Sequence, residues 1–184
     1  MSESSKSPAL PAGARVVASG RYLTFVNDNG WEYVIRSNIT GIVVIVAITD
    51  DERLLLVEQW RPAVRNRVIE LPAGLVGDVE AGETLPVAAS RELAEETGFS
   101  AREMLPVGAG PIAVGVSDEV VSFFHARGLT QVGPGGGDAS ESIVVHPVPL
   151  GGLRAFLAAR AADGLAVDPK IYAGLFLAGV AVPA

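Results

Sequence analysis

Residues 77–99 read GDVEAGETLPVAASRELAEETGF, and no other segment of the chain is as strongly patterned. Thr84 lies where a helix N-cap would be, because its hydroxyl oxygen can accept a hydrogen bond from an early backbone N–H. Pro86 follows within the first turn, where the missing N–H of proline costs little. Gly98 lies where a left-handed residue would end the helix. The segment therefore predicts a loop followed by a single helix.

Three glutamates of this helix share one face. Glu92, Glu95 and Glu96 stand at positions i, i+3 and i+4, which are neighbours on a helix surface. Their like charges repel, so the helix gains nothing from them by itself. A bound Mg²⁺ or Mn²⁺ would explain the arrangement, because these ions take hard oxygen ligands. An ordinary solvated acidic face is the simpler interpretation, but it leaves the adjacent Arg91 and the upstream Glu83 unexplained.

The spacing resembles the Nudix box, G-x5-E-x7-R-E-U-x-E-E-x-G-U, in which U is a bulky apolar residue. Every defined position is met, with Leu93 and Phe99 as the apolar residues. A motif of this length with this many fixed positions is specific. The resemblance implies a Nudix hydrolase, an enzyme that splits a nucleoside diphosphate linked to another group with the help of divalent metal and water.

The resemblance also implies roles inside the box. It makes Glu92, Glu95 and Glu96 the metal ligands and catalytic carboxylates, with Mg²⁺ as the expected ion and Mn²⁺ as a substitute. It makes Glu83 and Arg91 a supporting ion pair. Glutamates on a rigid helix suit the task because their positions do not drift.

The first glycine of the box has two candidates. The segment from Ala73-Gly74 to Glu83 is three residues longer than in the relatives that this chain resembles. Gly77 satisfies the spacing of the box, whereas Gly74 satisfies the Pro-Ala-Gly pattern of the relatives. In this family a backbone carbonyl just before that glycine often binds metal. Ala73 is therefore the predicted ligand, and Val76 is the competing one.

Two segments outside the box resemble the ADP-ribose pyrophosphatase branch of the family. The first is EQWRP at residues 58–62, followed by ELPAG at residues 70–74. The resemblance implies that Arg61 contacts the substrate phosphates, and the planar guanidinium suits phosphate geometry. The alternative is a surface ion pair between Arg61 and Glu58.

The second segment is GWEYVIR at residues 30–36. The resemblance implies that Trp31 stacks on adenine, that Glu32 accepts from the adenine amino group, and that Arg36 contacts phosphate or ribose. In the relatives this segment crosses to the partner subunit, which implies a homodimer in which the β segment 14–38 is exchanged. The alternative is that Trp31 only fills a gap against the core.

The resemblance implies that the general base comes from a flexible loop after the box, just ahead of the last strand, and the glycine-rich segment 131–142 is that loop here. Glu141 lies there, and a loop carboxylate that closes over substrate would couple closure to catalysis. The alternative for Glu141 is a solvated loop charge. His125 and His146 lie inside apparent strands, where structural roles are expected.

One departure from the branch bears on the substrate. ADP-ribose hydrolases commonly carry a proline after the box at the place that Val114 occupies here. Other nucleoside diphosphate sugars such as GDP-mannose, or a dinucleoside, therefore remain open. A non-hydrolytic, nucleotide-sensing protein is the alternative of a different class, although the box glutamates are intact.

The order of patterned segments predicts an α/β fold. Arg15 to Arg36 should form two or three strands with a hairpin at Asn29-Gly30, and the β-branched run at 39–49 should be a strand buried on both faces. Further strands are expected at 54–60, 68–71, 104–108, 119–125 and 143–148, and helices at 150–162 and 169–180. This order fits an α/β/α sandwich around a mixed sheet, as does the Nudix resemblance.

Composition limits the partners. With 184 residues and 49% hydrophobic residues, we expect one globular domain over 14–184 behind a disordered tail, 1–13. The net charge of −7 argues against a nucleic-acid partner. The apolar stretch 171–184 is too short to cross a membrane. The polar N-terminus does not resemble a signal peptide, and the absence of cysteine fits a reducing cytoplasm.

Overall fold

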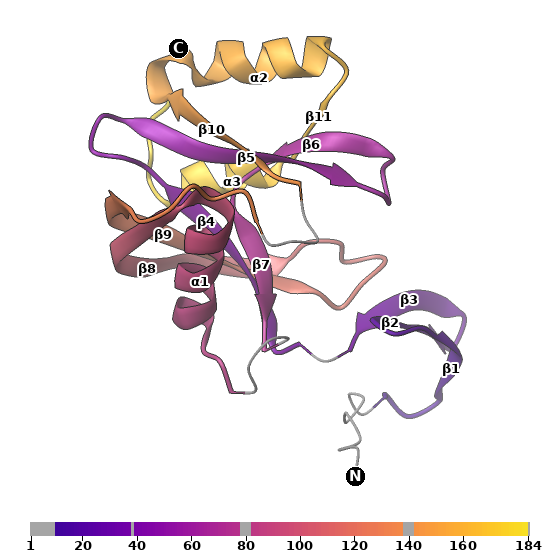
Figure 1. The fold of residues 1–184 in the computed structure, drawn as a ribbon. Coiled ribbons are helices and arrows are strands. Elements are labelled where there is room, and N and C mark those ends of the chain that lie inside the picture. The colour runs from indigo at the N-terminus through magenta and orange to yellow at the C-terminus, as the bar shows by residue number, and fades with distance from the viewer. Residues whose placement is uncertain (1–9, 38, 78–81, 138–141, 184) are drawn as a thin grey trace.

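The structure, a computed structural model, describes residues 10–37, 39–77, 82–137 and 142–183. These residues form three sheets and three α-helices (Figure 1). The first sheet is an antiparallel N-terminal sheet of β1 (Ala14–Ser19), β2 (Leu23–Asp28) and β3 (Trp31–Arg36). It stands to one side of the other two sheets in Figure 1.

Two four-stranded mixed sheets make up the rest of the fold. The first has the order β7 (Ala73–Val76), β4 (Gly41–Ala47), β9 (Val120–Gln131) and β8 (Phe99–Pro111), with β4 parallel to β9. The second has the order β10 (Val144–Pro149), β5 (Arg53–Arg61), β6 (Asn66–Glu70) and β11 (Ala166–Val167), with β11 parallel to β6.

Strand β4 runs through the centre of the molecule. Val43 to Ala47 are fully buried, because successive side chains point to opposite faces and both faces are covered. Val44 and Val46 pack with β5 and with two C-terminal helices, α2 (Leu153–Ala162) and α3 (Lys170–Leu177). Val43 and Ile45 pack with α1 (Leu85–Thr97).

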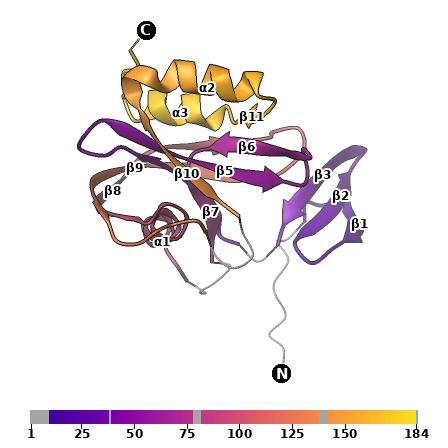
Figure 2. The same cartoon turned by 45° about the horizontal axis from the view of Figure 1, so that its top comes forward.

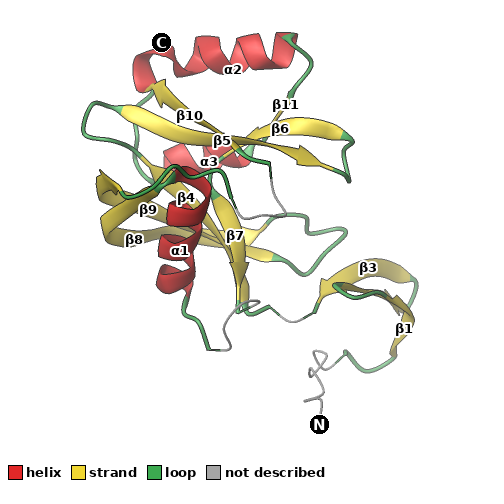
Figure 3. Ribbon diagram, viewed as in Figure 1, coloured by secondary structure: helices red, strands yellow, loops and turns green. Residues whose placement is uncertain are grey.

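The predicted α/β fold with helices on both sides is confirmed. Figure 2 shows α2 and α3 together on one side of the strands and α1 on the other, and Figure 3 shows α2 above β5 and α1 below it. The strands are divided between two four-stranded sheets rather than gathered in one. Leu54 and Leu56 of β5 share a core with Val44 and Val46 of β4, so burial of both strands in a common core holds the two sheets together.

Several predicted elements are confirmed, and two strands were missed. The hairpin forms at Asn29 and Gly30, whose φ angles are 51° and 94°. Helix α1 has Thr84 at its N-cap, without a side-chain cap hydrogen bond, and Gly98 at its C-cap in the left-handed region. The strands predicted at 104–108 and 119–125 belong to the longer β8 and β9. The missed strands, β7 and β11, are short and have little β-propensity pattern, so only pairing with β4 and β6 defines them.

The N-terminal sheet touches the rest of the molecule through β3. The Val34 N–H donates to the Val116 carbonyl at 2.8 Å, and Arg36 pairs with Glu119 at 2.6 Å. Residues 1–9 of the predicted tail lie outside the described residues. Within the described part of the chain, no helix is long and apolar enough to cross a membrane.

Candidate active site

Arg91 on α1 organises the carboxylates of the box. Its Nε and Nη2 donate to the two oxygens of Glu83 at 2.9 and 3.1 Å. Its Nη1 donates to Glu92 at 2.8 Å and to Glu95 at 3.1 Å, and Nη2 also donates to the Leu75 carbonyl at 3.1 Å. One guanidinium thus joins three glutamates of the box to strand β7, which offsets their mutual repulsion.

Glu83 is held by the loop that precedes α1. Its second carboxylate oxygen accepts from the Gly77 N–H at 3.3 Å. Gly77 has a φ of +81°, a conformation that suits glycine. The hydrogen bond from Arg91 lowers the pKa of the Glu83 carboxyl, while burial acts in the opposite direction. The structure therefore places Glu83 and Arg91 in the supporting ion pair that the resemblance implies.

Glu92 lies directly against Gly74. A Cβ atom added to Gly74 would fall 1.9 Å from the carboxylate carbon of Glu92. This close approach is possible only because Gly74 has no side chain. Both candidates for the first glycine of the box therefore contact its glutamates. The Gly77 N–H binds Glu83, and the missing side chain of Gly74 makes room for Glu92.

Glu96 of α1 is buried against strand β7, with 3% of its surface exposed. Its carboxylate accepts from the Ala73 N–H at 3.1 Å. Ala73 lines the adjacent cavity, whereas the Val76 carbonyl already accepts from the Thr40 backbone N–H at 2.8 Å and from its hydroxyl at 3.3 Å. These contacts favour Ala73 over Val76 as the backbone ligand.

The donors at β7 fit a hard cation. Glu92 and Glu96 both reach the Ala73-Gly74 dipeptide, so carboxylate oxygens gather beside a cavity, as Mg²⁺ prefers. Glu95 differs: its side chain is half exposed and turned to Arg91. Among the described residues no group of three or more histidine or acidic side chains is arranged to hold a metal. Two carboxylates and a backbone carbonyl are therefore the set that this geometry offers.

Beside these carboxylates lies a cavity of about 380 Å³. It is bordered by Glu92, by Arg61 and Arg36 from the predicted substrate site, and by three residues that the sequence did not single out, namely Glu70, Glu119 and Lys170. Arg61 donates to Glu70 at 2.8 and 2.5 Å. Glu70 is 5% exposed, so Arg61 is oriented by a buried carboxylate.

The cations that border the cavity all have acidic partners among the described residues. Arg36 pairs with Glu119, and Lys170 pairs with Asp168. Only the fold brings these residues together, because they come from β3, the loop before β9, and the start of α3. The sequence analysis gave no role to Glu70, although it begins the ELPAG segment, nor to Glu119 or Lys170.

The proposed alternative partner of Arg61 is engaged elsewhere. Glu58 accepts hydrogen bonds from Arg67 and, at 2.9 Å, from His146 Nε2. Burial raises the pKa of Glu58, but the hydrogen bonds from Arg67 and His146 outweigh it and lower that pKa overall. The other histidine, His125, is buried in β9, and burial lowers its pKa.

Trp31 and Glu32 do not join this cavity within one chain. Both lie at the start of β3, where Trp31 is 63% exposed and Glu32 accepts from Asn27 at 3.4 Å. Glu141 lies outside the described residues. The described residues before it bind the C-terminal end of α1. The Gly136 and Gly137 N–H groups donate to the carbonyls of Glu96 and Glu95 at 2.8 and 3.0 Å.

The fold of this chain is similar to that of a solved protein. The crystal structure of an ADP compounds hydrolase superposes with a TM-score of 0.68 at 25% sequence identity, covering 97% of this chain and 95% of that chain.

Sequence comparison finds relatives as well. The chain is 30% identical over 195 residues to the ADP-sugar pyrophosphatase of Mus musculus, covering 93% of this chain and 88% of the mouse protein. It is 36% identical over 90 residues to the ADP-ribose pyrophosphatase of Bacillus subtilis, covering 49% of this chain and 47% of that protein. It is 35% identical over 91 residues to the methanol dehydrogenase activator of Bacillus methanolicus, covering 50% and 48%. The matches span about half the length of these two bacterial relatives.

The model of the NUDIX domain matches residues 40–149. This range covers more than half of the chain and contains the whole box together with β4, β7 and α1. The chain therefore belongs to the NUDIX domain family.

Proposed function

We propose that this protein hydrolyses the pyrophosphate bond of a nucleoside diphosphate sugar in a reaction that depends on divalent metal. ADP-ribose is the leading substrate, with AMP and ribose 5-phosphate as products. The observation that carries the proposal is the position of Glu92 and Glu96 at Ala73-Gly74, beside a cavity that also presents Arg61. The names of the mouse and B. subtilis relatives support the substrate class.

Each part of the cavity has a task in this reaction. Glu92, Glu96 and the Ala73 carbonyl would hold Mg²⁺, with Mn²⁺ as a substitute, and Glu95 would join them by turning from Arg91. The bound ion supplies charge neutralisation and lowers the pKa of water. Arg61 and Arg36 hold the pyrophosphate, and the acidic partners Glu70 and Glu119 keep their guanidinium planes in place.

The water needs a base, and Glu141 is our candidate for it. The Gly136 and Gly137 contacts anchor the preceding part of the loop to the end of α1, close in sequence to the carboxylates that would hold the metal. A base delivered by a loop would let substrate closure complete the site.

We also propose a homodimer in which Trp31 and Glu32 reach the cavity of the partner subunit. In one chain these side chains lie outside the cavity. The N-terminal sheet and the loop after β8 expose large apolar side chains, among them Val16 at 50%, Val114 at 79% and Val116 at 63%. Association through this part of the chain would bury these exposed apolar side chains, as interfaces do.

Composition supports the remaining parts of the proposal. A net charge of −7 leaves no basic field for nucleic acid, so the partner is a small nucleotide sugar bound through local cations. The absence of cysteine supports a reducing cytoplasm as the compartment.

A substrate panel tests the proposal. Purified protein would be assayed with Mg²⁺ or Mn²⁺ against ADP-ribose, ADP-glucose, GDP-mannose and a dinucleoside polyphosphate, with products separated by chromatography. We expect ADP-ribose to be cleaved to AMP and ribose 5-phosphate, with chelation abolishing turnover. Preference for GDP-mannose or the dinucleoside would overturn the substrate assignment. Such a preference would fit Val114, which stands where ADP-ribose hydrolases commonly have a proline. Binding without turnover of any compound would replace hydrolysis by nucleotide sensing.

A further inference from the structure

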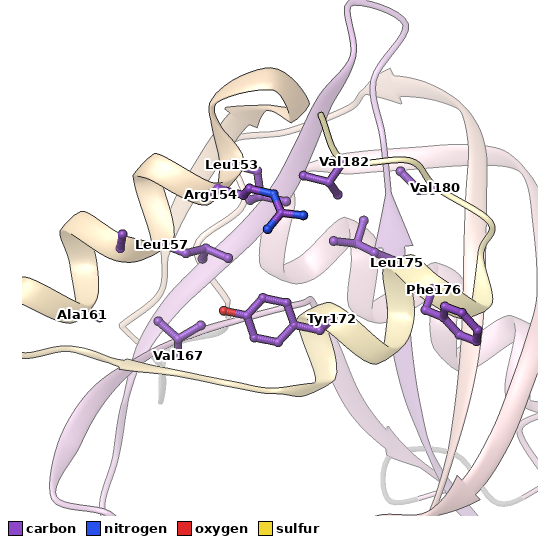
Figure 4. Close-up of a pocket in the computed structure, with 11 residues that line it drawn as sticks. Leu153, Arg154, Leu157, Ala161, Val167, Tyr172, Leu175, Phe176, Val180 and Val182 are labelled. Atoms are coloured by element: carbon purple, nitrogen blue, oxygen red, sulfur yellow. The ribbon is translucent and has the colours of Figure 1, made fainter. Parts of the chain in front are cut away.

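A second cavity lies between α2, α3 and the C-terminal segment, on the side of the molecule opposite α1. Its volume is about 550 Å³, which is within the usual range of roughly 300–1,000 Å³ for small-molecule sites. Its walls are mainly aliphatic and aromatic, as Figure 4 shows for Leu157, Tyr172, Leu175, Val180 and Val182. None of its lining residues borders the cavity at Glu92.

One cation, the solvent-exposed Arg154, lies at the edge of this apolar cavity. The guanidinium of Arg154 points into the space framed by Tyr172, Leu175 and Val182 (Figure 4). Within the described part of the chain, the Arg154 side chain has no hydrogen bond or ion pair. The neighbouring Arg160, by contrast, is paired with Asp163 at 2.8 Å.

The position of Arg154 on the helix also favours binding of an anion. It is the second residue of α2, and no acidic side chain occupies that first turn. The N-terminal end of a helix already carries partial positive charge. Arg154 therefore adds a positive charge at the mouth of an apolar cavity, and no acidic side chain among the described residues forms an ion pair with it.

We propose that this cavity binds a small amphipathic carboxylate, a molecule with an aliphatic or aromatic body and a single anionic group. The body fills the apolar space and covers Tyr172, which is 58% exposed, while the buried Leu175 forms part of the wall. The carboxylate accepts the two-pronged hydrogen bond that a guanidinium offers. Because the two cavities share no residue, this site stands apart from the proposed hydrolysis.

The test uses octanoate and octan-1-ol, which differ only in the head group. Binding to the full-length protein is followed by methyl NMR of the leucine and valine side chains and by calorimetry. We expect octanoate to bind at one site and to shift the methyl signals of Leu157, Leu175 and Val182. Octan-1-ol should bind about tenfold more weakly, because a hydrogen bond between charged groups is lost.

Arg154→Gln removes the charge and keeps much of the side-chain length. It should weaken octanoate about tenfold and leave octan-1-ol unchanged. Arg102→Gln, which changes an exposed arginine on β8, is the matched control and should leave both unchanged. Circular dichroism checks that each variant is folded.

Three results would overturn the proposal. One is that octanoate shifts no methyl group around the cavity. Another is that octanoate binds the Arg154→Gln variant as tightly as the parent. The third is self-association through this face, seen as a concentration-dependent mass in sedimentation that Phe176→Ser abolishes, since a second copy of the chain would then be the occupant.

Discussion

Two parts of the proposed site, the carboxylates around Arg91 and the start of strand β3, differ in how many contacts their side chains make within one chain. Arg91 is bound to Glu83, Glu92 and Glu95, and the buried Glu96 is fixed by Ala73. Trp31 is 63% exposed. The contrast teaches that the carboxylates of the proposed site are held in place within one chain, whereas Trp31, the proposed base-binding residue, is not covered by its own chain.

Glu96→Gln should have the largest effect and tests the preorganised cluster. Glutamine keeps an oxygen for the Ala73 N–H, so the fold should persist, but it removes the charge that would hold metal. We expect kcat for ADP-ribose to fall about 1,000-fold, equivalent to several kcal/mol of lost charge stabilisation. Glu103→Gln on the exposed part of β8 is the matched control. Parental turnover by Glu96→Gln would remove Glu96 from the metal site.

Gly74→Ala tests the close approach of strand and helix. The new Cβ would lie 1.9 Å from the Glu92 carboxylate carbon, so Glu92 must move away. A displacement of about 1 Å can cost about 100-fold in rate, and we expect a fall of that order in kcat. Gly110→Ala is the control, because nothing lies within 4 Å of its added Cβ. Equal rates for the two variants would show that the position of Glu92 is not critical.

Trp31→Ala tests the exposed end. Loss of stacking on a base costs about tenfold, so KM for ADP-ribose should rise by that factor while kcat changes little. Stability should stay the same, because the side chain is mostly in solvent. Tyr22→Ala removes another exposed aromatic ring from the same region and serves as control. An unchanged KM would exclude Trp31 from base binding.

Mixing the Trp31→Ala and Glu96→Gln proteins distinguishes the two arrangements of the site. If Trp31 serves the partner subunit, heterodimers contain one site with an intact Glu96 and an intact Trp31. Activity with the parental KM should then reappear after the chains exchange. If Trp31 serves its own chain, no site holds both residues and mixing restores nothing.

The smallest effect concerns pH and lies outside both regions. Burial lowers the pKa of His125, so the folded state binds its proton less readily than the unfolded state does. Stability should therefore decrease as the pH falls below the ordinary histidine value of 6.5. The thermal midpoint of His125→Gln should fall less than that of the parent between pH 7.5 and 5.5. Parallel curves would show that another group causes the loss.

Local patterns were sufficient for much of the fold. The β-branched run that contains β4 signalled a strand buried on both faces, and Asn29-Gly30 signalled a hairpin, because both features depend on neighbouring residues. Strands β7 and β11 were missed because segments of four and two residues are too short to show an alternating pattern, and pairing with β4 and β6 defines them. The division of the strands between two sheets likewise follows from packing between distant segments.

The same distinction holds for the candidate site. The sequence alone determined the box, since Glu83, Arg91 and the three glutamates of α1 lie within one loop and helix whose spacing sets their geometry. Only the tertiary structure decided that Gly74 admits Glu92, that Arg61 rests on Glu70, and that Lys170 borders the same cavity. Those residues are joined by contacts across strands and helices, and no periodicity along the chain encodes such contacts.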